Sequence, residues 1–177
     1  NEGRAKGESF KKFHAISPDF SGNKARKLAY FLAQDSIQGK KLIGYGSAQA
    51  NSLVSLAALA QLKGGQLDFY VQHLSGFLQD HPSGNYARAL ALGANIKCLP
   101  AAVKGADVEA YLQQWQREHE PQAVFIAEGG RMQEAEWGIQ QLAQEIITWS
   151  RAQNISALNV VLPSGTGTTA LYLQKHL

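Results

Sequence analysis

The chain has 177 residues, of which 45% are hydrophobic and 9% aromatic, and its formal charge is +3. This composition is typical of a globular protein with one ordinary domain or two small lobes, and no apolar run approaches the length of a membrane span. The basic clusters at residues 4–12, 24–27 and 40–41 contain one aromatic residue, Phe10, and not the interleaved series that a nucleic-acid platform requires, which argues against a nucleic-acid interface. The histidines lack metal-ligand spacing, and the lone Cys98 excludes an internal disulfide. We therefore expect a cytoplasmic protein with no metal site, and neither nucleic acid nor membrane as a partner.

Helical and strand patterns alternate along the chain. In order, we predict a helix over residues 24–34, a strand over 41–45, a helix over 52–62, a strand over 67–71, a helix over 86–92, a strand over 94–99, a helix over 107–119, a strand over 123–127, a helix over 135–152 and a strand over 158–162. Strands that alternate with helices form mainly parallel sheets covered on both faces. The predicted fold class is therefore α/β.

The first predicted helix begins in a lysine-rich segment, Ser-Gly-Asn-Lys-Ala-Arg-Lys-Leu at residues 21–28. Ser21 or Asn23 is expected to cap this helix. Lys24 would then lie at the positive end of the helix dipole beside two more cations, which lowers the pKa of its amine. An uncharged amine can attack a carbonyl group and form a Schiff base, so Lys24 is a candidate catalytic residue. The other interpretation is a capped surface helix with a solvated basic face.

The last predicted strand leads into a loop rich in glycine and hydroxyl groups. Its candidate ligand-binding residues are Ser164, Gly165, Thr166, Gly167, Thr168 and Thr169. Glycines let backbone N–H groups converge at the start of the following helix, where a phosphate group binds well. Since the loop itself has no lysine or arginine, we expect a neutral site, suited to a phosphate whose cofactor is bound covalently elsewhere. Together with Lys24, this loop indicates pyridoxal 5'-phosphate.

Two other interpretations of the loop remain. It could be a tight strand–helix turn without a ligand. It also fits the dinucleotide fingerprint as Gly165-x-Gly167-x-x-Ala170, but that fingerprint requires an acidic residue about 20 positions further on, beyond Leu177. The dinucleotide interpretation also leaves the lysine segment unexplained, so we rank it below a phosphate site.

The lysine segment and the loop, in this order, resemble pyridoxal-phosphate enzymes of the tryptophan synthase β type. The closer resemblance is to the 1-aminocyclopropane-1-carboxylate deaminase and D-cysteine desulfhydrase family, whose Ser-Gly-Asn-Lys-x-Arg-Lys-Leu segment carries the cofactor lysine, here Lys24. Three further segments resemble this family: Gly46–Asn51 with its alanine-rich helix, Gly84-Asn85 followed by Leu92-Gly93-Ala94, and Glu128-Gly129-Gly130. The resemblance extends from about Ser17 to the C-terminus.

Of two neighbouring residues, Asn51 matches the family pattern and Ala50 departs from it. Asn51 matches the family asparagine, which is expected beside the phenolic oxygen of the cofactor. Ala50 stands where the family has a serine implicated in handling the substrate. Because alanine offers neither a proton nor a nucleophile, the resemblance supports cofactor binding better than the ring-opening deaminase reaction, and it leaves an elimination more plausible.

The resemblance implies two lobes with the cofactor cleft between them. Residues 1–40 and 125–177 would belong to the larger, cofactor-binding lobe, and residues 41–124 would form a smaller α/β lobe. The implied reaction is a deamination or desulfhydration of a small amino acid, of the 1-aminocyclopropane-1-carboxylate or D-cysteine type, to a 2-oxo acid and ammonia. Enzymes of the family are longer, so we expect a chain truncated at its C-terminus. The alternatives are a non-catalytic relic that binds the cofactor and a purely structural role; a homodimer is expected by analogy.

Overall fold

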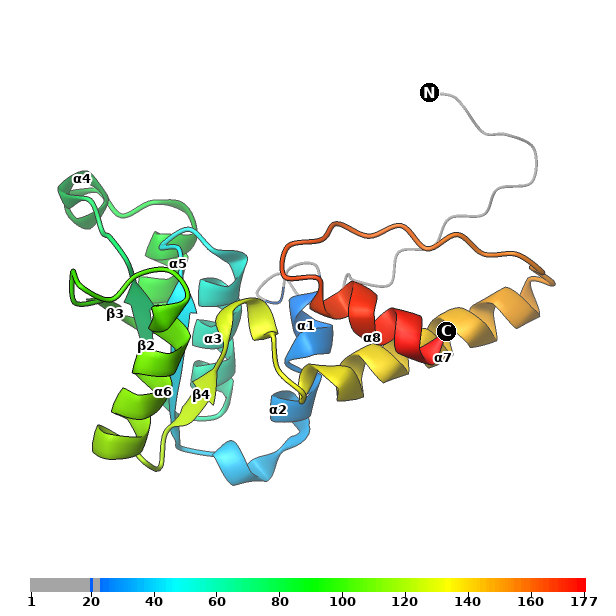
Figure 1. Cartoon of the computed structure of the whole chain (residues 1–177), viewed down its shortest axis with the longest axis horizontal. Helices are drawn as coiled ribbons and strands as arrows, with labels where there is room; N and C mark the ends of the chain where they lie inside the picture. The colour runs from blue at the N-terminus through cyan, green and yellow to red at the C-terminus, as the bar shows by residue number, and fades with distance from the viewer. Residues whose placement is uncertain (1–19, 21–22) are drawn as a thin grey trace.

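A parallel four-stranded sheet lies at one side of the molecule in the computed structural model, which describes Phe20 and residues 23–177 (Figure 1). The strands are β1 (Lys41–Gly46), β2 (Gln66–Val71), β3 (Asn95–Cys98) and β4 (Val124–Ile126), in the spatial order β3-β2-β1-β4. Leu42 of β1 pairs with Leu67 on one side and with Val124 on the other. The predicted α/β class with a parallel sheet is confirmed. In this order the chain crosses from one side of β1 to the other, so the carboxyl ends of β1 and β4 flank a switch point of the kind where α/β proteins bind ligands.

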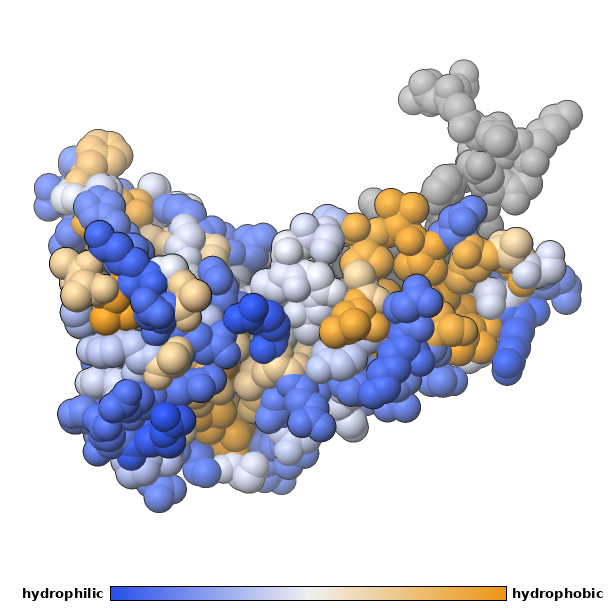
Figure 2. Space-filling view, viewed as in Figure 1, coloured by the Kyte–Doolittle hydropathy of each residue, from blue (hydrophilic) through white to orange (hydrophobic). Residues whose placement is uncertain are grey.

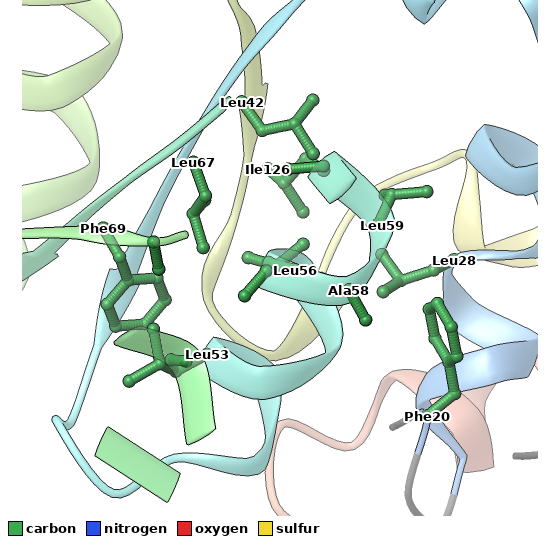
Figure 3. Packing of buried hydrophobic residues seen from close by; sticks show 14 of the residues in the cluster. Phe20, Leu28, Leu42, Leu53, Leu56, Ala58, Leu59, Leu67, Phe69 and Ile126 are labelled. Atoms are coloured by element: carbon green, nitrogen blue, oxygen red, sulfur yellow. The ribbon is translucent and has the colours of Figure 1, made fainter. Parts of the chain in front are cut away.

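Both faces of the sheet are covered, because successive strand residues point to opposite sides. On one face, Leu42, Leu67 and Phe69 pack against α3 (Asn51–Leu62), which is buried along most of its length (Figure 3). On the other face, Ile43 and Tyr70 pack against α6 (Asp107–His119). The short helices α4 (Gly76–Asp80) and α5 (Gly84–Ala91) follow β2 in the chain, and α5 lies beside α3.

A second group of helices lies beside the sheet. It contains α1 (Lys24–Lys27), α2 (Ala29–Ala33), α7 (Ala135–Ala152) and α8 (Thr168–His176), while two 3-10 turns, η1 (Asp35–Ile37) and η2 (Glu128–Gly130), connect it to the strands. Leu28 and Phe20 extend the main core from α3 toward this group (Figure 3). Helix α7 packs against α1, α2 and α8, so the four helices hold the start and the end of the described chain together (Figure 1).

Gly138 of α7 allows the closest of these approaches. A Cβ atom at this position would lie 2.0 Å from the carbonyl oxygen of Arg26 and 2.6 Å from the Cβ of Ala29. Any side chain would therefore push α7 away from α1 and α2. Since α1 carries Lys24, this glycine helps to determine where the lysine lies.

The first predicted helix and its cap differ from the structure. The helix expected over residues 24–34 is divided into α1 and α2 at Leu28. The Asn23 side chain makes no capping hydrogen bond to α1, because its amide donates to Thr169 instead; Ser21, the other expected cap, lies outside the described residues. The helices over 107–119 and 135–152 have the predicted bounds.

The buried strand predicted over residues 158–162 is wrong. This segment has no regular structure and is largely exposed, with Val161 at 94% and Leu158 at 41% of full exposure. Figure 2 shows apolar residues gathered on this face over α7, α8 and the segment between them. A strand needs a neighbour for its backbone groups, and no strand of the described chain lies against this segment.

The expected boundary between the lobes falls inside β4. This strand pairs with β1 and extends the same sheet to Ile126, two residues beyond the predicted end of the smaller lobe at residue 124. The division into two lobes itself stays a prediction. Within the described residues, no helix is both long and apolar enough to cross a membrane.

Candidate functional site

Helix α1 and the loop before α8 meet through their side chains, as the two motifs predict for a shared site. The Asn23 amide donates a hydrogen bond of 2.6 Å to the hydroxyl oxygen of Thr169. The Lys27 ammonium donates to the hydroxyl oxygen of Thr166 at 3.2 Å, across 139 positions of sequence. The fold thus places Lys24, which lies between Asn23 and Lys27 in the chain, beside this loop.

Lys27 is a site residue that the sequence interpretation missed. Its side chain is 3% exposed, and its Nζ also donates to the carbonyl oxygen of Gly129 at 3.0 Å. Burial, with a smaller contribution from the nearby charge of Lys24, lowers the pKa of Lys27 to about 8. The expectation of a neutral phosphate site is therefore wrong, because tertiary packing brings a cation to a loop that has none. The sequence did contain a signal for this role, because Lys24 and Lys27 are three residues apart and residues at that spacing share one face of a helix.

Lys24 has a lowered pKa, as predicted, but for a different reason. The cause is burial of the amine, and its Nζ lies 3.4 Å from the side-chain oxygen of Asn23. The expected dipole is weak, because α1 is a single turn of four residues. Arg26, the expected cationic neighbour, is neutralised by Glu145 through two hydrogen bonds of 2.7 and 2.8 Å. Partial burial therefore favours the uncharged amine that a Schiff base requires.

The loop has an exposed first half and a buried second half. Ser164, Gly165 and Thr166 are exposed, whereas Thr168 and Thr169 are buried at the start of α8. The hydroxyl groups of Thr166 and Thr168 share a hydrogen bond of 2.8 Å. Gly167 adopts a left-handed conformation (φ 75°) as the residue before the helix, which glycine adopts without strain.

The parts of this loop suit a compact anion. The first N–H groups of α8 have no partners within the helix, and hydroxyl groups and the Lys27 ammonium stand beside them. Backbone donors, the positive end of a helix and a cation together form an anion site. Such a site would hold the phosphate group of a cofactor attached to Lys24.

Asn51 lies at the first position of α3, in a separate hydrogen-bond network. Its side-chain oxygen accepts a 2.9 Å hydrogen bond from the side-chain amide of Asn85, which also donates to the carbonyl oxygen of Gln49. Ala50 precedes the helix as its N-cap and makes no side-chain cap. The loop from β1 to α3 thus presents an amide at the helix start, where the resemblance expects one.

The turn η2 lies between the end of β1 and the loop before α8. A Cβ at Gly46, the last residue of β1, would lie 3.3 Å from the carboxylate of Glu128, and a Cβ at Gly129 would lie 2.8 Å from the side chain of Thr166. Gly129 also has a φ of 65°. This position therefore favours glycine for two reasons, the left-handed backbone and the lack of space for a side chain beside Thr166. The end of β1 therefore reaches the phosphate-type loop through a single turn.

A cavity of about 560 Å³ opens at the carboxyl ends of β1 and β2. Glu128 and Gly46 line it, as do Tyr45, Gln72 and His73, whereas the two lysines do not. Tyr45 donates to Glu109 at 2.8 Å, and burial, followed by this carboxylate, raises the pKa of Tyr45 to about 12. The cavity and the buried Lys27 side chain thus both adjoin η2, the cavity at Glu128 and the lysine at Gly129.

Known proteins match the chain in structure and not in sequence. No family model and no curated protein matches the sequence. A solved "ACC deaminase homologue" is similar with a TM-score of 0.68 and 19% identity, over 93% of this chain and 50% of that one. A hydrogen sulfide-producing enzyme, solved with an α-aminoacrylate intermediate, has a TM-score of 0.59 and 15% identity over 85% of this chain and 44% of its own.

A third solved structure is diaminopropionate ammonia lyase of Escherichia coli in its apo form. Its TM-score is 0.60 at 18% identity, and the match covers 91% of this chain and 48% of that one. The chain thus spans about half the length of each of these solved structures. At such identities the likeness concerns architecture. The chain has the fold of these proteins, and the tryptophan synthase β-like α/β fold predicted from its motifs is confirmed.

Proposed function

We propose that the chain binds pyridoxal 5'-phosphate and belongs to a lyase or deaminase that converts a small amino acid to a 2-oxo acid and ammonia. The observation that carries this proposal is the junction of α1 with the loop before α8. There a half-buried lysine lies one helical turn from a buried lysine that contacts the hydroxyl group of Thr166. A reactive amine beside an anion site is the combination that this cofactor requires.

Three parts of the cofactor, the phosphate, the aldehyde carbon and the phenolic oxygen, have a suitable group on the chain. The phosphate would be held by Lys27, by the hydroxyl groups of Thr166, Thr168 and Thr169, and by the first amides of α8, with Ser164, Gly165 and Gly167 forming the backbone of the loop. Lys24 would bind the aldehyde carbon covalently. Asn51 would donate a hydrogen bond to the phenolic oxygen. These assignments use groups whose charge and hydrogen-bonding capacity match the cofactor.

Lys24 would also act as the base. When bound, the cofactor supplies an electron sink for the α-carbon of an amino acid. The Nζ of Lys24, released by the incoming amine, would take the proton from that α-carbon. Burial favours this role because it lowers the pKa of the amine and so raises the fraction that can accept a proton near neutral pH.

The substrate is a small amino acid with a leaving group on the β-carbon in this proposal. Ala50 lacks the hydroxyl group that the resemblance associates with ring opening, so we favour elimination over cleavage of a cyclopropane ring. Two of the structurally similar proteins are a hydrogen sulfide-producing enzyme and an ammonia lyase, and elimination is consistent with both names. D-cysteine and 1-aminocyclopropane-1-carboxylate remain the two substrates to compare.

The test is chemical trapping of the cofactor on the protein. Pyridoxal phosphate is added to the purified chain, the visible absorption is recorded, and the complex is reduced with borohydride before peptide mapping. We expect the label on Lys24 and its loss in Lys24→Ala. Lys27→Met is the matched control from the same helix, and it should keep the label on Lys24 at saturating cofactor. A label that persists in Lys24→Ala, or that maps to Lys27, contradicts the proposal.

A second candidate is a relic that binds the cofactor without turnover, and Ala50 is the observation that favours it. The two candidates differ first in the wild type, which should release ammonia from D-cysteine if it is a lyase and none if it is a relic. If the wild type is inactive, Ala50→Ser tests whether position 50 alone is responsible. If the rest of the site is competent, this variant gains release of ammonia from D-cysteine. A variant that binds the cofactor but produces no ammonia favours the relic.

A further inference from the structure

We propose that Asn85 is a positioning residue, which orients the Asn51 side chain so that its amide nitrogen faces the cofactor. This inference rests on the proposed function, because it concerns the pyridoxal-phosphate site. It comes from hydrogen bonds that join the β1–α3 loop to the start of α5. These hydrogen bonds give the Gly84-Asn85 pair a function, which the contacts between α1 and the loop before α8 do not.

Three contacts hold Asn85 against the loop. Its side-chain Nδ2 donates to the backbone carbonyl oxygen of Gln49 and to the side-chain Oδ1 of Asn51, both at 2.9 Å. Its backbone N–H donates to the Oε1 of Gln49, also at 2.9 Å. The Nε2 of Gln49 completes the clamp with a 3.1 Å hydrogen bond to the carbonyl oxygen of Ser83.

The orientation of both asparagines follows from one unambiguous acceptor. A backbone carbonyl can only accept, so the side-chain atom of Asn85 that faces Gln49 must be the nitrogen. The same nitrogen faces Asn51, and Asn51 must therefore present its oxygen. This network determines the amide orientation that coordinates alone leave open. With its oxygen committed to Asn85, Asn51 has its nitrogen to offer a ligand.

The phenolic oxygen of the cofactor requires that orientation. It carries negative charge and accepts hydrogen bonds, so an amide nitrogen stabilises it and an amide oxygen repels it. If Asn51 were free to rotate, it would present the wrong atom in part of the molecules. Asn85 removes that freedom, and it acts through Asn51 without touching the cofactor in this assignment.

Gly84 explains why the clamp is so close. It adopts a φ of 59°, and a Cβ there would lie 2.6 Å from the Oε1 of Gln49. A side chain at this position would displace Gln49 from the backbone of Asn85. The two residues of the Gly-Asn pair thus act together: Gly84 leaves space for the Gln49 side chain, and Asn85 orients the side chain of Asn51.

The experiment is a double-mutant cycle on cofactor affinity and spectrum. Pyridoxal phosphate is titrated by absorbance into the full chain and into Asn85→Ala, Asn51→Ala and the double variant. We expect Asn85→Ala to weaken binding about tenfold, within the range of one hydrogen bond to a charged group. It should also change the ratio of the visible to the near-ultraviolet band, which reports protonation of the phenolic oxygen. In the Asn51→Ala background, the same substitution should change neither quantity.

Two further variants separate positioning from folding. Asn85→Asp keeps the size of the side chain but has no donor for Asn51, so it should reproduce the spectral change. Asn159→Asp, at an exposed position, adds the same charge and should leave affinity and spectrum unaltered. Additive effects of Asn85 and Asn51, or a wild-type spectrum in Asn85→Asp, overturn the inference while cofactor binding stands. Absence of labelling on wild-type Lys24 overturns the proposed function and this inference with it.

Discussion

The Asn23 side-chain amide lies 2.6 Å from the hydroxyl oxygen of Thr169, although 146 positions separate the two residues. In this hydrogen bond the threonine oxygen accepts, so its own proton remains available to donate to a ligand in the loop. The residue before Lys24 is therefore held against the start of α8, next to the loop that we propose as the anion site. This contact also explains why Asn23 does not cap α1.

Loss of this hydrogen bond is expected to loosen the junction. Thr169→Val preserves the shape of the side chain and leaves the Asn23 amide without its acceptor. We predict a decrease of about 1 kcal/mol in the free energy of unfolding, together with weaker binding of pyridoxal phosphate. Urea denaturation measures the first effect and absorbance titration the second. Thr148→Val, at an exposed position of α7, is the control, and equal effects of the two substitutions would disprove the role of the contact.

Lys27 should make stability depend on pH in the alkaline range. Its pKa is about 8 in the folded chain, against the usual 10.5 for lysine. Between these values the unfolded chain binds more protons than the folded one, so the contribution of Lys27 to the free energy of unfolding rises with pH. Below about pH 8 the buried Lys27 side chain is charged, and the cost of burying that charge lowers the free energy of unfolding by its full amount. Denaturation at pH 7.5, 9 and 10 should show this rise in the wild type and a smaller one in Lys27→Met.

The same titration should appear in anion binding. Inorganic phosphate, tested as a competitor of pyridoxal phosphate, is expected to bind more weakly as the pH rises above about 8, because Lys27 then loses its charge. Lys27→Arg keeps a cation that does not titrate in this range. Its phosphate affinity should change less with pH than that of the wild type. If both proteins show the same pH profile, another group controls the anion site.

Gly138 should tolerate no side chain. In Gly138→Ala the new Cβ would meet the carbonyl oxygen of Arg26 at 2.0 Å, so α1 or α7 must move. We predict a loss of about 3 kcal/mol, at the upper end for overpacking, and weaker labelling of Lys24. Gly76→Ala in α4 is the matched control, since nothing lies within 4 Å of a Cβ there. Thermal unfolding compares the two, and similar melting temperatures would contradict the packing argument.

Ala50→Ser is expected to stabilise the chain whether or not it restores activity. Ala50 is the N-cap of α3, with the extended backbone (φ −66°, ψ 139°) that capping residues adopt, and it makes no side-chain cap. A serine hydroxyl can accept from the first N–H groups of the helix, which is worth about 1 kcal/mol. Chemical denaturation of the two proteins measures this gain. A gain in stability without a gain in turnover would assign position 50 a structural role alone.

Local patterns were sufficient for much of the fold. The apolar repeats of 107–119 and 135–152 predicted α6 and α7 with their bounds, because helical periodicity is a property of neighbouring residues. The alternation of strands and helices predicted the parallel sheet for the same reason. The segments around Lys24 and Thr166 could be recognised because glycine, hydroxyl and lysine residues have distinct backbone and chemical properties.

What the sequence by itself determined was therefore the α/β class and the two segments of the candidate site. The tertiary structure alone decided three other features: the exposure of residues 158–162, the approach of Lys27 to Thr166, and the orientation of Asn51 by Asn85. The physical reason is common to all three. A strand needs a neighbouring strand, a buried cation needs hydrogen-bond acceptors, and a side-chain amide needs a neighbour that fixes its orientation. In each case the partner is distant in sequence, so only the folded chain shows whether it is present.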